Sequence, residues 1–476
     1  MQCQLGVRML LSLLALLFLT GCSQSKILPY TEEWTESRID HFNPIIRTPD
    51  KFAQRMLVNK QYFDEDAGPI LLYTGNEGAI DQFWNNTGFV FELAELHKGY
   101  VIFIEHRYYG KSIPFGDAWT QNYNYQFLTV EQAIADYAVI ISRLKTSLGN
   151  PKRKVIAFGG SYGGVLTAFM RFKYPNIVDG GLAASAPIYP MGGYDFYRAV
   201  TEDCERYNSQ CPIRVRSGYT MLLDTVKTMS GLDKVTQLFH LCKPLTALSL
   251  PHFLLWARNA FTIMAMADYP YPASFLGSLP AYPINDACNT ILGGDDALSG
   301  LANATVRFYD ATATGSHTQC HDLDKEYITC ADATGCGNMA QWDIQICLQV
   351  RLASGTNNKT DMFPPIEPWT DSVYEAYCAK KYGSGLAYNT DFYNINFWTD
   401  QIRGASNLIF SNGDLDPWRY GGVYGTDLPS TVYPIIVKGG AHHLDLRGSD
   451  KRDPATVTAA RDVEKLIIAD WLYLGN

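Results

Sequence analysis

The segment that most constrains the fold runs from Val155 to Pro175 and has a serine at the centre of a glycine-rich turn. A short apolar run precedes Gly159-Gly160-Ser161-Tyr162-Gly163-Gly164, and the apolar side chains after it fall mostly on one helical face. We predict a buried strand, a sharp turn with Ser161 at its apex, and a helix that Pro175 ends. Glycines suit such a turn because the backbone is strained and helix packs on strand without space for Cβ atoms. Ordinary serines also occur in Gly-x-Ser-x-Gly turns, so the remaining chain must supply a base, an acid and an oxyanion hole.

Strand and helix patterns alternate on both sides of this turn. Helical character over 81–96 and helical spacing of apolar residues over 129–148 separate short apolar runs that we predict to be strands. Such alternation forms right-handed βαβ units, so we predict an α/β fold with a mostly parallel sheet. Residues 30–50 are expected to be an irregular lead-in. The expected strands are 54–58, 69–73, 100–104, 155–158, 180–186, 407–410 and 432–437, and the residues of the last helix expected to face the sheet are Val457, Ala460, Val463, Leu466, Ile467 and Trp471.

The middle of the chain has a different character. Between about 193 and 394, strand patterns are absent and aromatic residues, prolines and cysteines accumulate. We predict an α/β domain in two parts, residues 40–192 and 395–476, with 193–394 inserted as a mainly helical cap braced by disulfides. All of the 11 cysteines except Cys3 and Cys22 lie in this insertion, and their number there is odd, so one thiol is expected to be unpaired.

The N-terminal segment predicts export. Arg8 precedes an apolar run, Met9 to Leu19, which is too short to span a bilayer and fits a signal peptide over residues 1–22. Leu19-Thr20-Gly21-Cys22 also resembles a bacterial lipobox, and lipidation at Cys22 is the one membrane attachment that the sequence predicts. Disulfides and sequons fit the secretory pathway, with a lysosomal or vesicular lumen or the extracellular space as destination. The sequons begin at Asn85, Asn303 and Asn358.

Residues that can form a catalytic triad occur at predicted strand ends. Ser161 comes first, Asp416 follows the strand at 407–410, and His442 follows the strand at 432–437. Serine, then acid, then histidine is the chain order of the α/β-hydrolase fold, which we therefore predict for the two-part domain. A serine hydroxyl needs a base to attack, an imidazole can take and return the proton, and a carboxylate on the other ring nitrogen fixes the tautomer.

The acid and the base each have a competitor nearby. Leu415 separates Asp414 from Asp416, which indicates that only one carboxylate points inward, and we prefer Asp416. His443 competes with His442, and we prefer His442 because the small Gly440-Ala441 pair before it leaves room for the loop. A third histidine, His106, lies too early for the chain order and is expected to be structural.

The oxyanion hole is expected to consist of two backbone N–H groups. One belongs to Tyr162, directly after the candidate nucleophile, and the other comes from the loop Gly75-Asn76-Glu77-Gly78 after an early strand, where we assign Asn76. This chemistry uses side chains and backbone alone, so no cofactor is expected. Close cysteine or histidine spacing typical of a zinc site is also missing from the sequence.

Taken together, these motifs resemble one family of serine peptidases, which contains lysosomal Pro-X carboxypeptidase and dipeptidyl peptidase II. The resemblance extends from about Asp40 to Trp471 and implies Ser161, Asp416 and His442 as the triad. The motifs that carry it are Gly160-Ser161-Tyr162-Gly163-Gly164, Thr74-Gly75-Asn76-Glu77-Gly78, Glu105-His106-Arg107-Tyr108-Tyr109-Gly110, Ser411-Asn412-Gly413 with Leu415-Asp416-Pro417-Trp418, and Gly440-Ala441-His442-His443-Leu444-Asp445-Leu446-Arg447.

The family has two branches, and the cap resembles the dipeptidyl peptidases. The resemblance therefore implies a serine exopeptidase that releases N-terminal dipeptides with Pro or Ala in second position. The alternative is a Pro-X carboxypeptidase that releases the C-terminal residue after proline, and a distant alternative is a catalytically silent binding protein on a hydrolase scaffold. The cap segments that carry the resemblance are Trp256–Phe261, Asp268–Pro272, Cys330–Cys336 and Thr360–Pro364.

A dipeptidyl peptidase needs a carboxylate to bind the substrate ammonium group. Asp332, inside the Cys330–Cys336 segment, is the candidate, and Asp343 is the alternative. The expected partner is a peptide; the net charge of −9 argues against nucleic acid, and a homodimer is compatible with the sequence. The disulfides that the resemblance implies are Cys211–Cys288, Cys242–Cys320, Cys347–Cys378 and Cys330–Cys336, which leave Cys204 as the free thiol.

Overall fold

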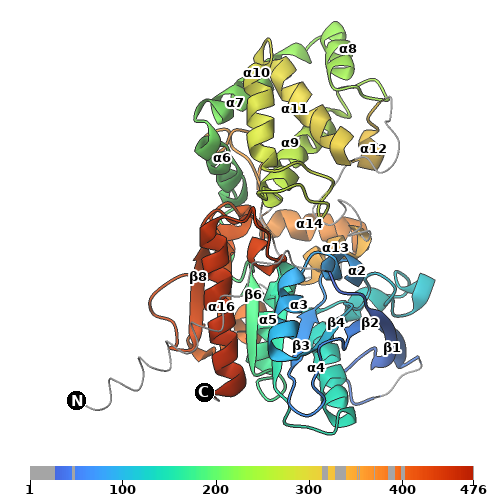
Figure 1. Ribbon diagram of the computed structural model, residues 1–476. Helices are drawn as coiled ribbons and strands as arrows, with labels where there is room; N and C mark the ends of the chain where they lie inside the picture. Colours follow the sequence, from blue (N-terminus) through green and yellow to red (C-terminus); the bar gives the residue numbers. More distant parts are fainter. Residues whose placement is uncertain are drawn as a thin grey trace.

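The architecture is a single mixed sheet with a helical insertion above it (Figure 1). The computed structural model describes residues 27–45, 49–312, 320–326, 339–350, 352, 354–368, 370–383, 392–397 and 402–474. The 8-stranded sheet has the order β1-β2-β4-β3-β5-β6-β7-β8. Its strands are β1 (Thr31–Arg38), β2 (Lys51–Asn59), β3 (Ile70–Thr74), β4 (Tyr100–Ile104), β5 (Val155–Gly160), β6 (Gly180–Ala184), β7 (Leu408–Gly413) and β8 (Val432–Val437).

The first strand corrects the prediction of an irregular lead-in. β1 pairs antiparallel with β2 along its whole length, from Thr31 opposite Val58 to Arg38 opposite Lys51. β1 is mostly exposed and polar. An edge strand with one open side carries few buried apolar residues, so its pattern is weak.

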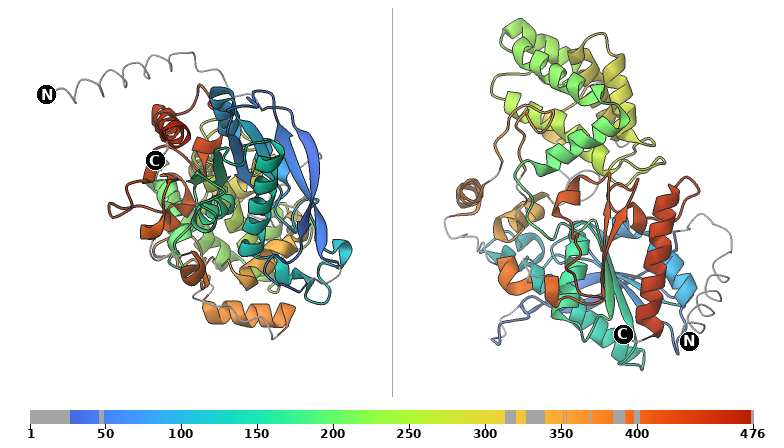
Figure 2. Two further views of the ribbon diagram at one scale, coloured as in Figure 1. Left: turned by 90° about the horizontal axis from the view of Figure 1, so that it is seen from below. Right: turned by 90° about the vertical axis from the view of Figure 1, so that its left-hand side faces the viewer.

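The strands from β3 onward form the predicted parallel core of an α/β hydrolase, whereas β2 pairs antiparallel with β4. β3 to β8 pair in parallel, and β3 to β7 are buried throughout, as expected for strands covered by helices on both faces. One face packs against α4 (Val130–Ser147) and α5 (Tyr162–Lys173). The other packs against α2 (Ile80–Trp84), α3 (Gly88–His97) and α16 (Ala455–Tyr473), and Figure 2 shows the two layers on either side of the sheet.

The helix predicted over 81–96 is two helices. α2 ends at Trp84 and α3 begins at Gly88, so the Asn85-Asn86-Thr87 sequon forms the connection. Thr87 is buried, and its hydroxyl donates to the carbonyl of Phe83, which turns the chain between the helices. A side-chain hydroxyl that bonds back to the preceding turn competes with the helix there.

A group of helices that comes between β6 and β7 in the sequence forms the predicted cap above the sheet (Figure 1). Its own hydrophobic core is built around α9 and the helices beside it. Its helices are α6 (Asp195–Tyr207), α7 (Gln210–Thr225), α8 (Met229–Leu238), α9 (Leu250–Met266), α10 (Pro283–Gly293), α11 (Ala297–Thr312) and α12 (Leu323–Glu326). The later helices of the insertion contribute to other hydrophobic clusters, and the Phe397 ring of the last one stacks on Phe169 of α5. They are α13 (Met339–Leu348), α14 (Asp371–Tyr382) and α15 (Phe392–Phe397). The short 3₁₀ helices of the chain are η2 (Gly116–Ala118), η3 (Asn124–Phe127), η4 (Ile402–Gly404), η5 (Pro417–Gly421) and η6 (Leu444–Leu446).

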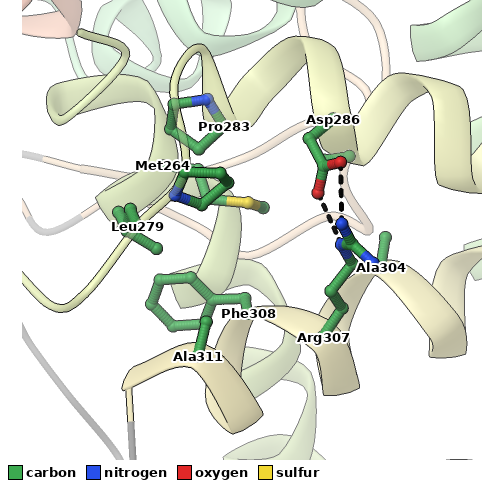
Figure 3. A pocket seen from close by; sticks show the side chains of 10 residues that line it. Met264, Leu279, Pro283, Asp286, Ala304, Arg307, Phe308 and Ala311 are labelled. Atoms are coloured by element: carbon green, nitrogen blue, oxygen red, sulfur yellow. Dashed lines mark hydrogen bonds and ion pairs between the residues drawn. The ribbon is translucent and has the colours of Figure 1, made fainter. Parts of the chain in front are cut away.

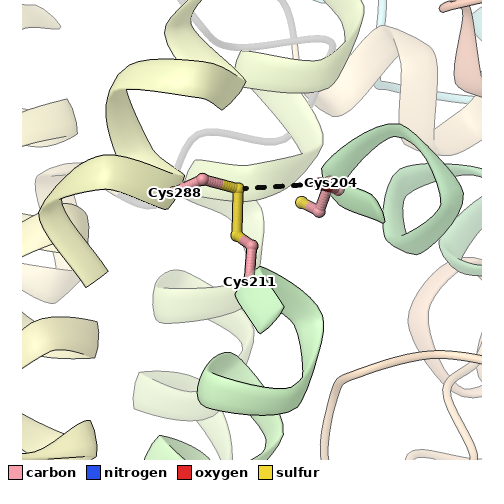
Figure 4. Close-up of side chains that lie close together, drawn as sticks. All are labelled: Cys204, Cys211 and Cys288. Carbon is pink, nitrogen blue, oxygen red and sulfur yellow. Dashed lines mark hydrogen bonds between the residues drawn. A yellow bond between two sulfur atoms is a disulfide. The ribbon is translucent and has the colours of Figure 1, made fainter. Parts of the chain in front are cut away.

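Disulfides brace this cap as the family resemblance implies. Cys211–Cys288, Cys242–Cys320 and Cys347–Cys378 are all present, and the fourth pairing, Cys330–Cys336, lies outside the described residues. Cys204 is a buried free thiol, as predicted, and it lies beside the Cys211–Cys288 bridge (Figure 4). Burial raises the pKa of this thiol well above its usual range, so it stays protonated and unreactive.

The cap also contains a cavity between α9, α10 and α11. Its volume is about 240 Å³, its walls are mostly apolar, and the ion pair between Asp286 and Arg307 borders it (Figure 3). None of the candidate triad residues lines it. Among the described helices, none is both long and apolar enough to cross a membrane.

Candidate active site

Ser161 lies at a strained turn between β5 and α5. Its backbone has φ 58° and ψ −128°, a conformation that an L-residue adopts at a cost of about 1–3 kcal/mol. The surrounding glycines make the turn possible: a Cβ on Gly159 would lie 2.1 Å from the carbonyl oxygen of Gly163. The strand, strained serine and helix together match the nucleophile turn of α/β hydrolases, as the sequence predicts.

Asp416 and His442 meet at the edge of the sheet where this turn lies, and the His442 ring is 4.8 Å from that of His443, which lies against Gly160. Asp416 follows β7, His442 follows β8, and Nδ1 of His442 lies 3.0 Å from each carboxyl oxygen of Asp416. Both residues are buried, and Asp416 also accepts a hydrogen bond from the backbone N–H of Trp418 at 3.0 Å. This arrangement holds the Nδ1–H tautomer and leaves Nε2 as the basic nitrogen.

The cap holds the histidine in place, which sequence patterns do not reveal. The backbone N–H of His442 donates to the carbonyl oxygen of Met266, the last residue of α9, at 3.0 Å. The hydroxyl of Tyr269 donates to the carbonyl oxygen of His442 at 2.9 Å. The position of the candidate base therefore depends on the insertion as well as on the sheet.

The competing residues of the sequence analysis have other partners. Asp414 forms an ion pair with Arg206 at 2.9 Å and accepts a hydrogen bond from the N–H of Gly439. The ring of His443 lies against Gly160, where a Cβ would come within 2.7 Å of it. Burial lowers the pKa of His443 well below its usual range, so this ring stays neutral and acts as packing.

His106 lies beneath the site as a structural residue. Its Nδ1 is 2.6 Å from the carbonyl oxygen of Arg107, and its Nε2 is 3.1 Å from the hydroxyl of Tyr162. Burial lowers its pKa to about 4. A neutral histidine in contact with these two groups supports the Tyr162 side chain and does not reach toward Asp416.

The two predicted oxyanion donors lie on either side of the turn. Tyr162 is the first residue of α5, so its N–H has no carbonyl acceptor within the helix. Asn76 uses its side chain as a clamp: Nδ2 donates to the carbonyl oxygen of Gly160 at 2.7 Å, and Oδ1 accepts from the hydroxyl of Tyr73 at 2.9 Å. This clamp fixes the loop after β3 against the turn and leaves the backbone N–H of Asn76 as the candidate donor.

Glu77, in the same loop, was not singled out by the sequence analysis. Its Oε2 atom is buried and has no hydrogen-bond partner among the described residues. Burial raises the pKa of this carboxyl, while its own N–H, His442 and Asn76 oppose the shift. The sequence offers one indication of Glu77, its position in the Gly75–Gly78 motif. That motif is explained equally well by the turn and the backbone N–H group that an oxyanion loop needs.

Of the two candidate ammonium-binding carboxylates, the structure describes Asp343 alone. Asp332 lies outside the described residues. Asp343, on α13, forms an ion pair with Lys381 at 2.8 Å and accepts hydrogen bonds from the hydroxyls of Tyr377 and Tyr382. Its carboxylate is thus already neutralised by residues of α14.

Comparison with known proteins relates the whole chain to proline-directed peptidases. A family model described as serine carboxypeptidase S28 matches residues 37–464. The lysosomal Pro-X carboxypeptidase of Mus musculus is 37% identical over 93% of this chain and 89% of the relative. The Homo sapiens protein of that name is 36% identical over 93% and 88%. Prolyl carboxy peptidase like protein 5 of Caenorhabditis elegans is 35% identical over 93% and 90%.

Proposed function

Because this chain belongs to the serine carboxypeptidase S28 family and is therefore a serine-type peptidase, we propose that it releases the C-terminal residue that follows a proline. The contact of His442 with Asp416 next to the strained Ser161 is the observation that supports catalysis most strongly. The choice of substrate end follows the Pro-X carboxypeptidases, which are similar over nearly the whole chain. The dipeptidyl activity expected from the cap has no such relative among those described above.

In the proposed reaction, Ser161 Oγ attacks the carbonyl carbon of the prolyl residue and its proton passes to Nε2 of His442. The negative oxygen of the tetrahedral intermediate accepts hydrogen bonds from the backbone N–H groups of Tyr162 and Asn76. The C–N bond then breaks as His442 gives the proton to the leaving amino group. Water, deprotonated by His442, attacks the acyl-enzyme and frees the serine. Asp416 stabilises the imidazolium formed in each half-reaction.

Apolar groups beside His442 form a candidate proline pocket. The indole N–H of Trp418 donates to the sulfur of Met266 at 3.2 Å, and the ring of Phe196 packs on Trp418 with centroids 4.8 Å apart. The Trp418 and His442 rings are 6.5 Å apart. A compact apolar wall at this distance from the base suits the rigid pyrrolidine ring of proline.

Release of N-terminal dipeptides is the second candidate, because the cap segments Trp256–Phe261 and Asp268–Pro272 resemble the dipeptidyl branch. In that case Asp332 would bind the substrate ammonium group. Asp343 is the weaker choice, because its carboxylate is paired with Lys381.

The two candidates differ in which end of the peptide must be free. The test is hydrolysis of an N-blocked peptide that ends in Pro-Phe, compared with Lys-Pro and Lys-Ala chromogenic substrates with and without N-acetylation. The proposal predicts release of phenylalanine from the blocked peptide. Cleavage of the unacetylated Lys substrates alone would contradict it and favour the dipeptidyl candidate.

The setting of the enzyme is proposed from its relatives and its disulfides. The names of the mammalian relatives support a lysosomal lumen, and the disulfides fit the secretory pathway. The signal peptide at 1–22 and the lipobox at Cys22 remain predictions, because they lie outside the described residues. The absence of a nucleic-acid partner and the homodimer also remain predictions.

A further inference from the structure

Glu77 is a carboxyl group in the active site that the reaction above does not use. It directly follows Asn76, the candidate oxyanion residue, in the loop after β3. The titratable groups that face it come from three different elements: Tyr73 from β3, Tyr162 from α5, and His442 from the loop after β8. Glu77 therefore lies near both the candidate nucleophile turn and the candidate base.

The carboxyl has an oxygen atom whose hydrogen-bonding capacity is unused. Its Oε2 atom lacks a hydrogen-bond partner among the described residues, although a buried oxygen without a partner costs about 1–3 kcal/mol. The Oε2 atom is buried, whereas the residue as a whole is partly exposed. Among the described residues, His442 is the neighbour that contributes a coulombic interaction to this carboxyl, and no Lys or Arg does. A buried acidic oxygen without a partner, in a partly exposed residue near the candidate base, points to a ligand-binding group.

We propose that Glu77, in its neutral form, donates a hydrogen bond to the terminal carboxylate of the peptide. In this way it selects peptides in which a single residue follows the scissile bond. This inference rests on the proposed C-terminal release. When a single residue is removed, the terminal carboxylate lies only about 3.5 Å beyond the cleaved bond, so its partner must lie inside the catalytic cleft. A carboxylic acid bonded to a carboxylate is a charge-assisted hydrogen bond, which is among the strong ones.

The protonation state of Glu77 follows from its surroundings. Burial raises the pKa of its carboxyl, and burial also raises the pKa of Tyr73 and of Tyr162, so both phenols stay neutral beside it. Glu77 therefore keeps its proton to a higher pH than an exposed glutamate does, and the protonated carboxyl is a hydrogen-bond donor. As the pH rises it ionises and repels the substrate carboxylate. The preference for a free C-terminus should therefore weaken toward alkaline pH.

The test compares N-blocked Pro-Phe, which has a terminal carboxylate, with the same peptide as its C-terminal amide. kcat/KM is measured from pH 4.5 to 8 for the wild type, Glu77→Gln and Glu77→Leu. The amide corrects for effects of pH on the reaction that are common to both substrates. Glu131→Gln is the matched control, because Glu131 is also partly buried with a raised pKa, but its carboxylate already accepts a hydrogen bond from Gln349.

For the wild type, the ratio of acid to amide kcat/KM should fall as the pH rises. Glu77→Gln keeps a neutral donor, so its ratio should stay flat across the pH range. Glu77→Leu removes the donor and should lower kcat/KM for the acid about 10- to 100-fold at pH 5 while leaving the amide within a few-fold. Glu131→Gln should match the wild type, and thermal unfolding verifies that each variant is folded.

Two outcomes contradict the inference in distinguishable ways. If the wild type releases phenylalanine but Glu77→Gln keeps the wild-type dependence on pH and on the terminal carboxylate, Glu77 has no part in selecting the substrate. If the wild type does not release phenylalanine and instead removes N-terminal dipeptides, the proposed function itself is wrong. A loss of that dipeptidyl activity in Glu77→Gln would then identify an ionised carboxylate that binds ammonium, the opposite of what is proposed.

Discussion

At the scale of single residues, the two aspartates after β7 can be compared to test which of them is the acid of the candidate triad. Asp416→Asn keeps the shape of the site but favours the wrong tautomer of His442, so kcat should fall about 10⁴-fold. Asp414→Asn removes an ion pair that is partly exposed, so kcat/KM should stay within about threefold of the wild type. Steady-state kinetics on one proline-containing peptide measures both. Equal losses in the two variants would contradict the assignment of Asp416.

The candidate triad could be proposed from sequence because each member follows a strand in a fixed chain order, and those strands have strong apolar patterns. Glu77 could not, because its importance comes from what is missing around its Oε2 atom. The neutralisation of Asp343 by Lys381 was equally invisible, since the two residues belong to different helices. Spacing along the chain identifies candidates, whereas their partners depend on how the helices pack.

At the scale of elements, the end of α9 should control the rate through its hold on the histidine loop. Tyr269→Phe deletes the hydrogen bond to the carbonyl oxygen of His442, which is worth about 1 kcal/mol. We expect kcat to fall about fivefold with little change in KM. Tyr309→Phe is the matched control, because its hydroxyl donates at 2.8 Å to the carbonyl oxygen of Trp256 inside the cap.

Tyr309→Phe should lose a similar amount of stability in thermal unfolding but keep the wild-type kcat. If both variants keep the wild-type kcat, the cap does not position the base. If both lose it equally, the loss comes from general destabilisation of the cap.

Helix α16 shows where apolar periodicity predicts the wrong face. Val457, Ala460 and Trp471 are buried as expected, but Val463 and Leu466 are 45% and 48% exposed. Arg461 and Glu464 occupy buried positions on the same helix instead. Arg461 donates to the carbonyl oxygens of Leu444 and Asp445 in η6, so this face of the helix anchors the histidine loop. A pattern of apolar residues alone cannot reveal a buried polar contact.

At the scale of the whole molecule, buried carboxyl groups and buried histidines should give stability opposite dependences on pH. Burial raises the pKa of Asp268 to about 7 from a usual value of 3.8. The folded state therefore binds a proton that the unfolded state lacks between these values, and this group's contribution falls as the pH rises from about 4 to 7. His106, with its pKa lowered to about 4, acts in the opposite direction.

A comparison of the wild type with Asp268→Asn isolates the carboxyl contribution. Asparagine can keep the contacts with Tyr207 and the N–H of Ile284 but does not titrate. The free energy of unfolding of the wild type should fall relative to that of the variant by up to ~4 kcal/mol between pH 4 and pH 7. Denaturant unfolding at several pH values measures it. A difference that is constant or rises with pH would show that Asp268 is ionised in the fold.

The central proposal for the whole molecule is that the protein shortens peptides from the C-terminal end. The measurement uses one peptide that begins with Lys-Pro and ends with Pro-Phe, both ends free, with products identified by mass spectrometry. The account predicts release of phenylalanine and an otherwise intact peptide, with no products from Ser161→Ala. Release of the dipeptide Lys-Pro in place of phenylalanine, or unchanged activity of Ser161→Ala, would contradict it.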